Sequence, residues 1–493
     1  MRARALLAAV AAASAPAVAS AHAIGERYDL PLPVHLYVLG GALVVALSFA
    51  VVALAVRLDT RGAARWARFF VWAAPPPSLV AAEWLLRAIG IVAFGLAITA
   101  GLVGEQHPGR NIAPTLVWIV WWIGLALIAA LIVNPWPWLN PWRSLALIAA
   151  RFIPAPRARR YPRAWAEWPA VAGLFLLVWF ELVYPAPSHP RAIAIVALAY
   201  SLATFAGMAM FGRETWLKRG EVFSLFFALL GRFAPLAIGR HGIVIRPWGM
   251  ALARPQRVSG ATVAFILLML AAVLFDGFLG TGLWRALERG VRALLPPGAD
   301  RDNLVAATLG LLALWLAFLG AYRLAAVAMA RMAGSGLDGR ALASRFAQTL
   351  IPIGVGYNLA HNLSYLLVQG QAIAPLASDP LGRGWNLFGT AHWQIAIGVI
   401  DAGAVWSVAL FAIVGGHLVA VYIGHLAALR LFANRQAALR ALVPLTVLMV
   451  VYTAVSLTVI AEPLVRFRKP DPSYSEPQRR DAPFGAAMAY AWR

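Results

Sequence analysis

The stretch that decides the fold class runs from Val34 to Val56, VHLYVLGGALVVALSFAVVALAV, and it contains no Asp, Glu, Lys or Arg. At a rise of ~1.5 Å per residue, a helix of this length crosses the ~30 Å hydrocarbon layer of a bilayer. Outward from it, similar apolar segments follow at about 87–104, 112–133, 168–184, 192–211, 258–278, 303–322, 346–368, 403–425 and 441–462. We predict an all-α polytopic membrane bundle of about ten transmembrane helices.

The overall composition also indicates a protein embedded in lipid. Hydrophobic residues make up 61% of the chain and charged residues only 13%, whereas soluble domains carry about 25% charged residues. The chain has 20 Trp, many of them at the ends of the apolar segments, where amphipathic rings settle at the membrane interface. The lipid bilayer is therefore the first expected partner.

The net charge of +22 reflects orientation in the membrane rather than binding to nucleic acid. The basic residues, nearly all Arg, are spread through short loops between apolar segments. If the mature amino terminus lies outside, the cytoplasmic loops hold about three times as many basic residues as the outer loops, which is the usual positive-inside bias. We predict a bacterial inner-membrane protein with both termini in the periplasm and no nucleic-acid partner.

The amino-terminal sequence has the pattern of a secretory signal peptide. Arg2 and Arg4 precede an Ala-rich apolar stretch, and Ala19-Ser20-Ala21 forms an A-x-A cleavage site. Cleavage would remove residues 1–21 and leave His22 as the new terminus, whereas an uncleaved first helix is the alternative. The expected organisation is then a bundle over residues 22–462 and an extended, Pro-rich periplasmic tail over 463–493.

Two connecting segments are expected to be more than linkers. Residues 212–257 combine apolar and basic side chains in an amphipathic pattern. This pattern indicates either an amphipathic helix on the cytoplasmic face or a segment packed under the bundle. Residues 369–402 are polar for this chain but also carry Trp385, Phe388 and Trp393. We therefore expect a structured outer segment there.

Several families of function lose support from motifs that the sequence lacks. There is no Gly-rich loop ending in Gly-Lys-Ser/Thr, no Gly-x-Ser-x-Gly and no His-Glu-x-x-His. An ATP-driven pump, a common serine hydrolase and a helix-borne zinc protease are disfavoured, and no nucleotide cofactor is expected. Because the chain has no Cys, any metal would be held by His, carboxylate or amide ligands.

Histidines concentrate in the outer half of the predicted topology and are the candidate metal ligands. We predict that His361, His392, His417 and His22 could hold a divalent metal, zinc or copper, because imidazole is a common ligand for both. A bis-His haem is not expected, because His361 and His417 would lie at different depths in their helices. A structural hydrogen-bonded pair is the alternative for His417 and His425.

The segment from Tyr357 to Tyr365 is polar within a predicted span, and such residues tend to face a cavity or the bundle interior. Tyr357, His361 and Tyr365 fall on one helical face. We expect Asp401 to act as a general base or to orient a ligating His, while Glu181 and Asp276 are expected only to cap helices or snorkel. We expect Arg383 to be catalytic. The residues expected to bind the substrate are Tyr357, Tyr365, Gln369, Gln371 and Trp385.

Three blocks of the chain together resemble a family of bacterial multi-pass membrane proteins labelled fenitrothion hydrolase. They are HAIGERYDLPLP (22–33), the region from His361 through QGQ (369–371) to SDPLGRGWNLFG (378–389), and GHLVAVYIGH (416–425). Members of that family often carry Asp at the position of Asn386 and Ala at the position of Gly424. The Asn386 difference weakens a role for a carboxylate at that position.

The resemblance implies hydrolysis of a small hydrophobic ester, an aryl dialkyl phosphorothioate, in a membrane-embedded site. Such hydrolysis generally uses a metal-bound hydroxide, so a metal-assisted organophosphorus hydrolase is the first functional hypothesis. A transporter or permease for a small molecule or metal ion is the second, because buried His and a Pro-kinked helix suit it equally. The third is a copper-handling or assembly subunit of an inner-membrane complex, with metal bound at the mature His22 terminus.

Overall fold

A computed structural model describes residues 32–55, 70–72, 77–153, 157–239, 242–296, 298–300 and 302–464. Nine helices in these ranges are long and apolar enough to cross a membrane. The bounds of the main helices are α2 Val34–Ala55, α4 Pro77–Val103, α9 Trp168–Leu182, α10 Pro190–Phe211, α13 Gly260–Leu279, α15 Leu304–Ala333, α17 Ile351–Gln369, α19 Ala402–Leu431 and α20 Arg435–Leu464. One of the nine apolar spans combines α5 (Ile112–Pro114), the π-helix η2 (Thr115–Leu125) and α6 (Ala126–Leu131), whereas α17 is not counted among the nine.

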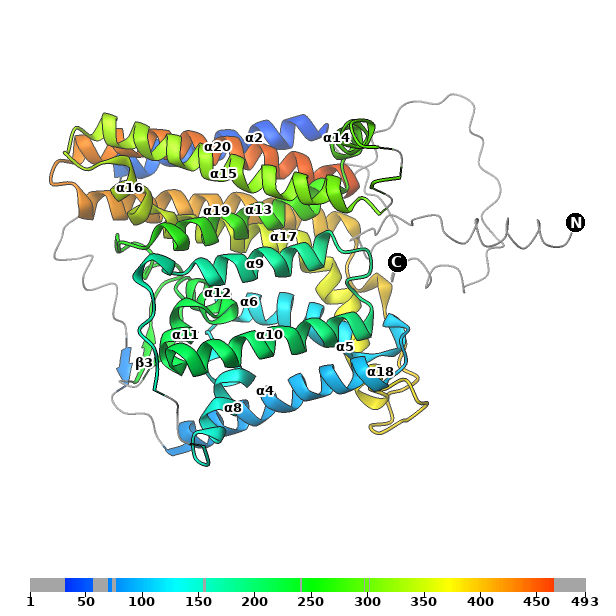
Figure 1. Cartoon of the computed structure of the whole chain (residues 1–493). Coiled ribbons are helices and arrows are strands. Elements are labelled where there is room, and N and C mark those ends of the chain that lie inside the picture. The colour runs from blue at the N-terminus through cyan, green and yellow to red at the C-terminus, as the bar shows by residue number, and fades with distance from the viewer. Residues whose placement is uncertain are drawn as a thin grey trace, which may run out of the picture.

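These helices run roughly side by side as one bundle (Figure 1), which confirms the predicted all-α membrane architecture. The span expected at 346–368 is α17, a helix of 19 residues. It is not among the nine apolar helices because its Tyr, Asn, His and Gln residues lower its hydropathy. Its buried position between α13 and α19 shelters those side chains from lipid.

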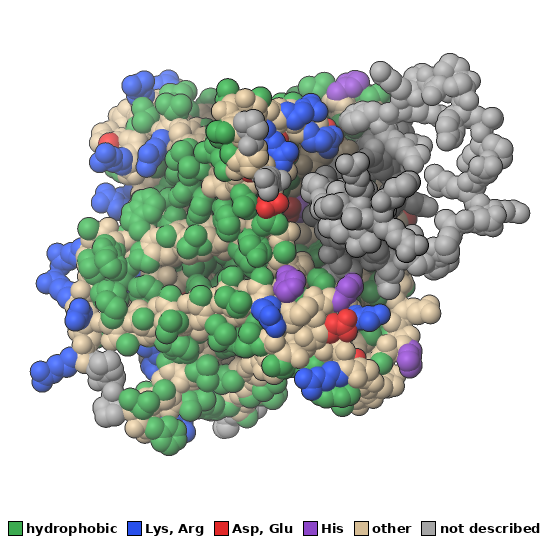
Figure 2. All heavy atoms as spheres, turned by 45° about the vertical axis from the view of Figure 1, so that its right-hand side comes forward, with side chains coloured by type: hydrophobic (Ala, Val, Ile, Leu, Met, Phe, Trp, Pro, Cys, Tyr) green, Lys and Arg blue, Asp and Glu red, His purple; other side chains and the backbone are tan. Residues whose placement is uncertain are grey.

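The exposed surface of the bundle is apolar where lipid would contact it. Leu39, Leu43 and Leu47 of α2 and Leu202 of α10 are exposed, although exposed leucine rows would be unfavourable in water. Figure 2 shows hydrophobic side chains over a broad band of the visible face, with Lys and Arg mostly toward its edges. The outer faces of the helices therefore suit a bilayer.

Short helices and a small sheet lie at the two ends of the bundle. At one end lie α16 (Gly339–Phe346) and a small antiparallel sheet with strand order β1-β3-β2. The strands are β1 Phe70–Trp72, β2 Leu236–Gly239 and β3 Gly242–Ile245, and Val244 pairs with both Val71 and Ala237. At the opposite end lie α14 (Gly282–Ala293) and α18 (Ile373–Ser378) (Figure 1). We call these the α16 end and the α18 end.

Segment 212–257 packs into the bundle instead of lying flat on its face. It contains α11 (Arg213–Arg219) and α12 (Val222–Gly231), and most of the α12 side chains are buried. Phe223 contacts Trp121 with ring centroids 4.4 Å apart, and Phe226 stacks on Trp122 at 5.0 Å. Of the two interpretations of this segment, the structure has the one in which it packs under the bundle.

Glu221 fixes the start of α12. Its carboxylate accepts hydrogen bonds from the backbone N–H groups of Phe223 (2.9 Å) and Ser224 (2.7 Å) and from the Tyr200 hydroxyl (2.6 Å). Asn140 donates a fourth bond at 3.3 Å. Glu221 is fully buried, and burial raises its pKa above the ordinary value. Its oxygens are therefore satisfied by these protein donors and not by water.

Some expected boundaries were too short, because polar residues continue a helix beyond the hydrocarbon layer. Helix α15 extends to Ala333 instead of 322, and α20 begins at Arg435 instead of 441. The amphipathic α14 was not anticipated; its Trp284 is buried while Leu283 and Leu287 are exposed, as in an interfacial helix. The predicted signal peptide (1–21) and the tail beyond residue 464 lie outside the described residues.

Candidate functional site

A cavity inside the bundle is the main candidate site. The space in it that the centre of a water molecule can occupy is about 80 Å³, and all the space between atoms, open solvent included, is about 890 Å³. Helices α9, α12, α13 and α17 and the η2–α6 span line it. Along α17 the lining extends from Ile351 to Asn362, which is about 16 Å at 1.5 Å per residue. The cavity is therefore elongated along the helices, like a slot between them.

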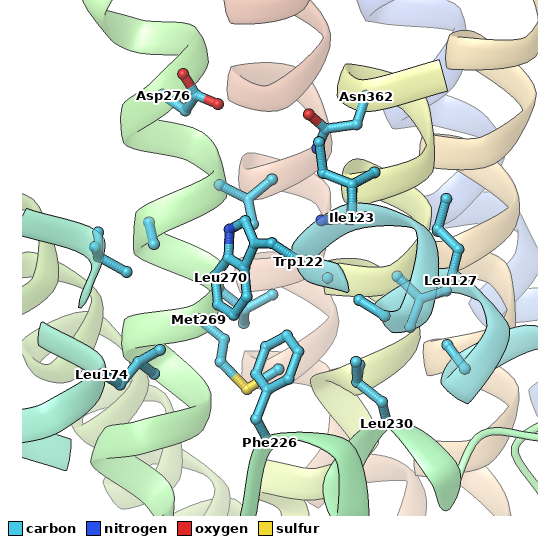
Figure 3. Close-up of a pocket in the computed structure, with 18 of the residues that line it drawn as sticks. Trp122, Ile123, Leu127, Leu174, Phe226, Leu230, Met269, Leu270, Asp276 and Asn362 are labelled. Carbon is cyan, nitrogen blue, oxygen red and sulfur yellow. The ribbon is translucent and has the colours of Figure 1, made fainter. Parts of the chain in front are cut away.

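The cavity is polar at one end and apolar at the other. Asp276 and Asn362 lie at the polar end, Phe226 lies at the apolar end, and Trp122 stands between them (Figure 3). Asp276 is close to the last residue of α13, Leu279, so the polar end points toward the α18 end of the bundle. Helix α12 supplies Phe226 and Leu230 and so closes the apolar end.

A close contact between the Asp276 carboxylate and the His361 imidazole is the central feature of the polar end. The Nε2 atom of His361 lies 2.8 Å from Oδ2 of Asp276. The side chain of His361 is only 2% exposed, against 25% for Asp276. Asp276 lines the cavity and His361 does not. The imidazole therefore contacts the carboxylate from the protein side, away from the cavity, and fixes its orientation toward the cavity.

A second carboxylate, Glu181 of α9, lines the same polar end. It lies close enough to interact electrostatically with Asp276, and Trp122 lies near it in the same wall of the cavity. Asn358 also lines the cavity, and its buried amide oxygen has no hydrogen-bond partner among the described residues. The polar end is thus rich in oxygen acceptors.

Close packing around Gly277 positions Tyr357, one of the two aromatic residues expected in the substrate site, beside His361. A Cβ at Gly277 would lie 2.7 Å from the Tyr357 hydroxyl oxygen and 3.9 Å from Cε1 of His361. The rings of Tyr357 and His361 stack at 6.1 Å. Tyr365 interacts electrostatically with both Glu181 and Asp276. Tyr357 and Tyr365 therefore border the acidic end without lining the cavity.

Two glycines bring α17 and α19 into direct backbone contact. A Cβ at Gly356 would lie 2.3 Å from the carbonyl oxygen of Ala412, and one at Gly416 would lie 2.6 Å from that of Pro352. The crossing buries His417, whose Nδ1 bonds the Ile413 carbonyl at 2.9 Å. Its Nε2 has no hydrogen-bond partner among the described residues. His417 faces the core beside Tyr452 (ring centroids 5.6 Å apart) and does not line the cavity.

The residues predicted in segment 369–402 stabilise that segment instead of lining the cavity. Gln369 is buried, and Gln371 donates hydrogen bonds to the Leu367 and Ala396 carbonyls at 2.8 and 3.1 Å. The Arg383 guanidinium lies 5.9 Å from the Trp385 ring centroid. The segment is thus folded by its own polar contacts, although none of these side chains reaches the cavity.

Asp401 and His392 are exposed, and Asp401 caps α19 by accepting a hydrogen bond from the Ala404 N–H at 2.8 Å. No group of three or more His, Asp or Glu with metal-site geometry occurs in the part of the chain that the structure describes. His22 lies outside that part. The prediction of a zinc or copper site is therefore untested.

Comparison with family models, with curated proteins and with solved structures gives no significant match. The resemblance to the fenitrothion hydrolase family consequently rests on the three sequence blocks alone.

Sequence reasoning placed His361 correctly in the bundle interior but missed Asp276 and Glu181 as cavity residues. Both lie near helix ends, where a carboxylate can reach water and needs no special role. The available signal was their rarity: acidic residues within apolar segments are functional candidates by default. One sequence does not reveal that α9, α13 and α17 are neighbours, so the convergence of these residues was hidden.

Proposed function

We propose that this protein is a proton-coupled membrane permease for a small, largely apolar molecule. The observation that carries the proposal is the Asp276–His361 pair, 2.8 Å apart, at the polar end of an elongated cavity inside the bundle. Buried Asp, Glu and His residues in membrane helices typically mark substrate pathways and proton relays. Asp276 faces the cavity while His361 supports it, so one residue can meet the substrate and the pair can hold the proton.

The residues that line the cavity support a role in transport more than a role in catalysis. Two carboxylates, Asp276 and Glu181, share its polar end, and no Lys or Arg is among the described residues that line it. A protonated His361 can balance at most one of these two carboxylates, so the remaining negative charge must be neutralised by a proton or by a bound cation. If the proton is released when the cation binds, and is taken up again when the cation leaves, movement of protons is coupled to movement of the substrate.

The test is uptake by the purified full chain reconstituted in liposomes with an acidic lumen. We expect accumulation of at least one of three labelled probes: benzyltrimethylammonium (a cation), benzamide (neutral) or benzenesulfonate (an anion). Asp276→Asn and His361→Gln should abolish it, while Glu288→Gln, on the exposed α14, should not. Accumulation of none of the probes by wild-type protein, or equal accumulation by Asp276→Asn, would contradict the permease proposal.

Hydrolysis of organophosphorus aryl esters is the second candidate, favoured by the three resembling blocks and by the orientation of Asp276. In that reaction Asp276 would accept a proton from water, the water oxygen would attack phosphorus, and the bond from phosphorus to the aryl oxygen would break. The aryl oxide would leave and be protonated as a nitrophenol. Nitrophenol release from fenitrothion, lost in Asp276→Asn and measured beside the metal content of the same samples, would select this candidate and test the zinc or copper prediction.

For the location we infer a bacterial inner membrane with the α16 end in the cytoplasm. The α16 end carries Arg254, Arg257, Arg331, Arg340 and Arg345, and basic loops are retained on the cytoplasmic side. The mature amino terminus would then be periplasmic, and the polar end of the cavity would face the periplasm. Partners in a membrane complex remain a separate prediction of the sequence.

A further inference from the structure

We infer that the molecule bound in the cavity is a lipophilic organic cation, with a compact apolar body and an ammonium-type head. This inference rests on the permease proposal, because it names the class of substrate that the permease would carry. The evidence for the substrate class is the charge and shape of the cavity. Three features of the described residues point in the same direction.

The first feature is the polar end, which offers acceptors and negative charge. Asp276 and Glu181 are close enough to interact electrostatically, and the buried Asn358 amide oxygen lines the same space without a hydrogen-bond partner among the described residues. A cationic head placed there would gain charge-assisted contacts. An anionic or strongly acceptor-rich head would face repulsion instead.

The second feature is aromatic. Trp122 projects between the polar and apolar ends (Figure 3), and its ring stacks on Phe226 at 5.0 Å. Organic cations are attracted to the faces of Trp rings within about 6 Å. Trp122 and Glu181 both line the cavity, so the aromatic wall lies beside the carboxylate.

The third feature is the apolar remainder of the slot. Its wall consists of aliphatic and aromatic side chains from α9, α12, α13 and α17, including Leu174, Met269, Leu270 and Leu230. Met is unbranched and adapts to ligands of different shape. The slot therefore suits a small aryl or alkyl body attached to the cationic head.

Binding of benzyltrimethylammonium to detergent-purified wild-type protein tests the inference directly. We expect saturable binding, with its uncharged carbon isostere neopentylbenzene competing about tenfold more weakly or worse, since tenfold corresponds to one lost charged contact. Asp276→Asn and Glu181→Gln should each weaken binding by about tenfold. Glu288→Gln is the matched control, and size-exclusion profiles establish that each variant is folded.

The outcomes separate this inference from the permease proposal. Binding of the cation without gradient-driven uptake would support the ligand class and overturn transport. Uptake of benzamide or benzenesulfonate in place of the cation would support transport and overturn the ligand class. Equal affinity for the cation and its neutral isostere, or unchanged affinity in both carboxylate variants, would also overturn the ligand class.

Discussion

At the scale of single residues, the α17–α19 crossing depends on the absence of a side chain at Gly356. An added methyl group would lie 2.3 Å from the Ala412 carbonyl oxygen, and neither backbone can move without disturbing Tyr357 and His417 beside it. Overpacking of this kind generally costs about 1–3 kcal/mol. We expect Gly356→Ala to lower the thermal unfolding temperature of the detergent-solubilised protein by several degrees, as followed by circular dichroism.

The matched control lies on the facing helix. A Cβ at Gly415 would meet nothing within 4 Å, so Gly415→Ala should leave the unfolding temperature unchanged or raise it slightly, because Ala is the better helix former. Equal destabilisation by both substitutions would mean that the crossing is not as close as the structure has it.

At the scale of elements, α12 closes the cavity and Glu221 holds α12 in place. Glu221→Ala would remove four hydrogen bonds and leave buried donors unsatisfied, which costs about 1–3 kcal/mol. We expect a loss of that size in thermal stability, together with weaker binding of benzyltrimethylammonium, because Phe226 and Leu230 would shift. Glu214→Ala, which removes only exposed ion pairs with Arg143 and Arg213, should change neither measurement.

The elements also show how much could be predicted from the sequence. Hydropathy located every main helix, because an apolar segment of spanning length has few alternatives, but α4 begins at Pro77 instead of 87 and α15 ends at Ala333 instead of 322. It did not predict how α12 packs, since its Phe and Leu residues suit a membrane surface and a protein interior equally. The pairing of His361 with Asp276 was hidden for a similar reason: the two residues are 85 positions apart, and nothing local indicates which helices are neighbours.

At the scale of the whole molecule, orientation decides which compartment the acidic end of the cavity faces. The chain has no Cys, so single cysteines can be introduced without removing any. Ser335→Cys lies exposed between α15 and α16, and Phe388→Cys lies exposed in the segment after α18. The basic α16 end should be cytoplasmic. In intact Gram-negative cells whose outer membrane has been permeabilised, a membrane-impermeant maleimide should therefore label Phe388→Cys, and it should label Ser335→Cys only after the inner membrane is disrupted. The reverse labelling order would place the acidic end of the cavity in the cytoplasm, and a permease working in that orientation would take its substrate from inside the cell.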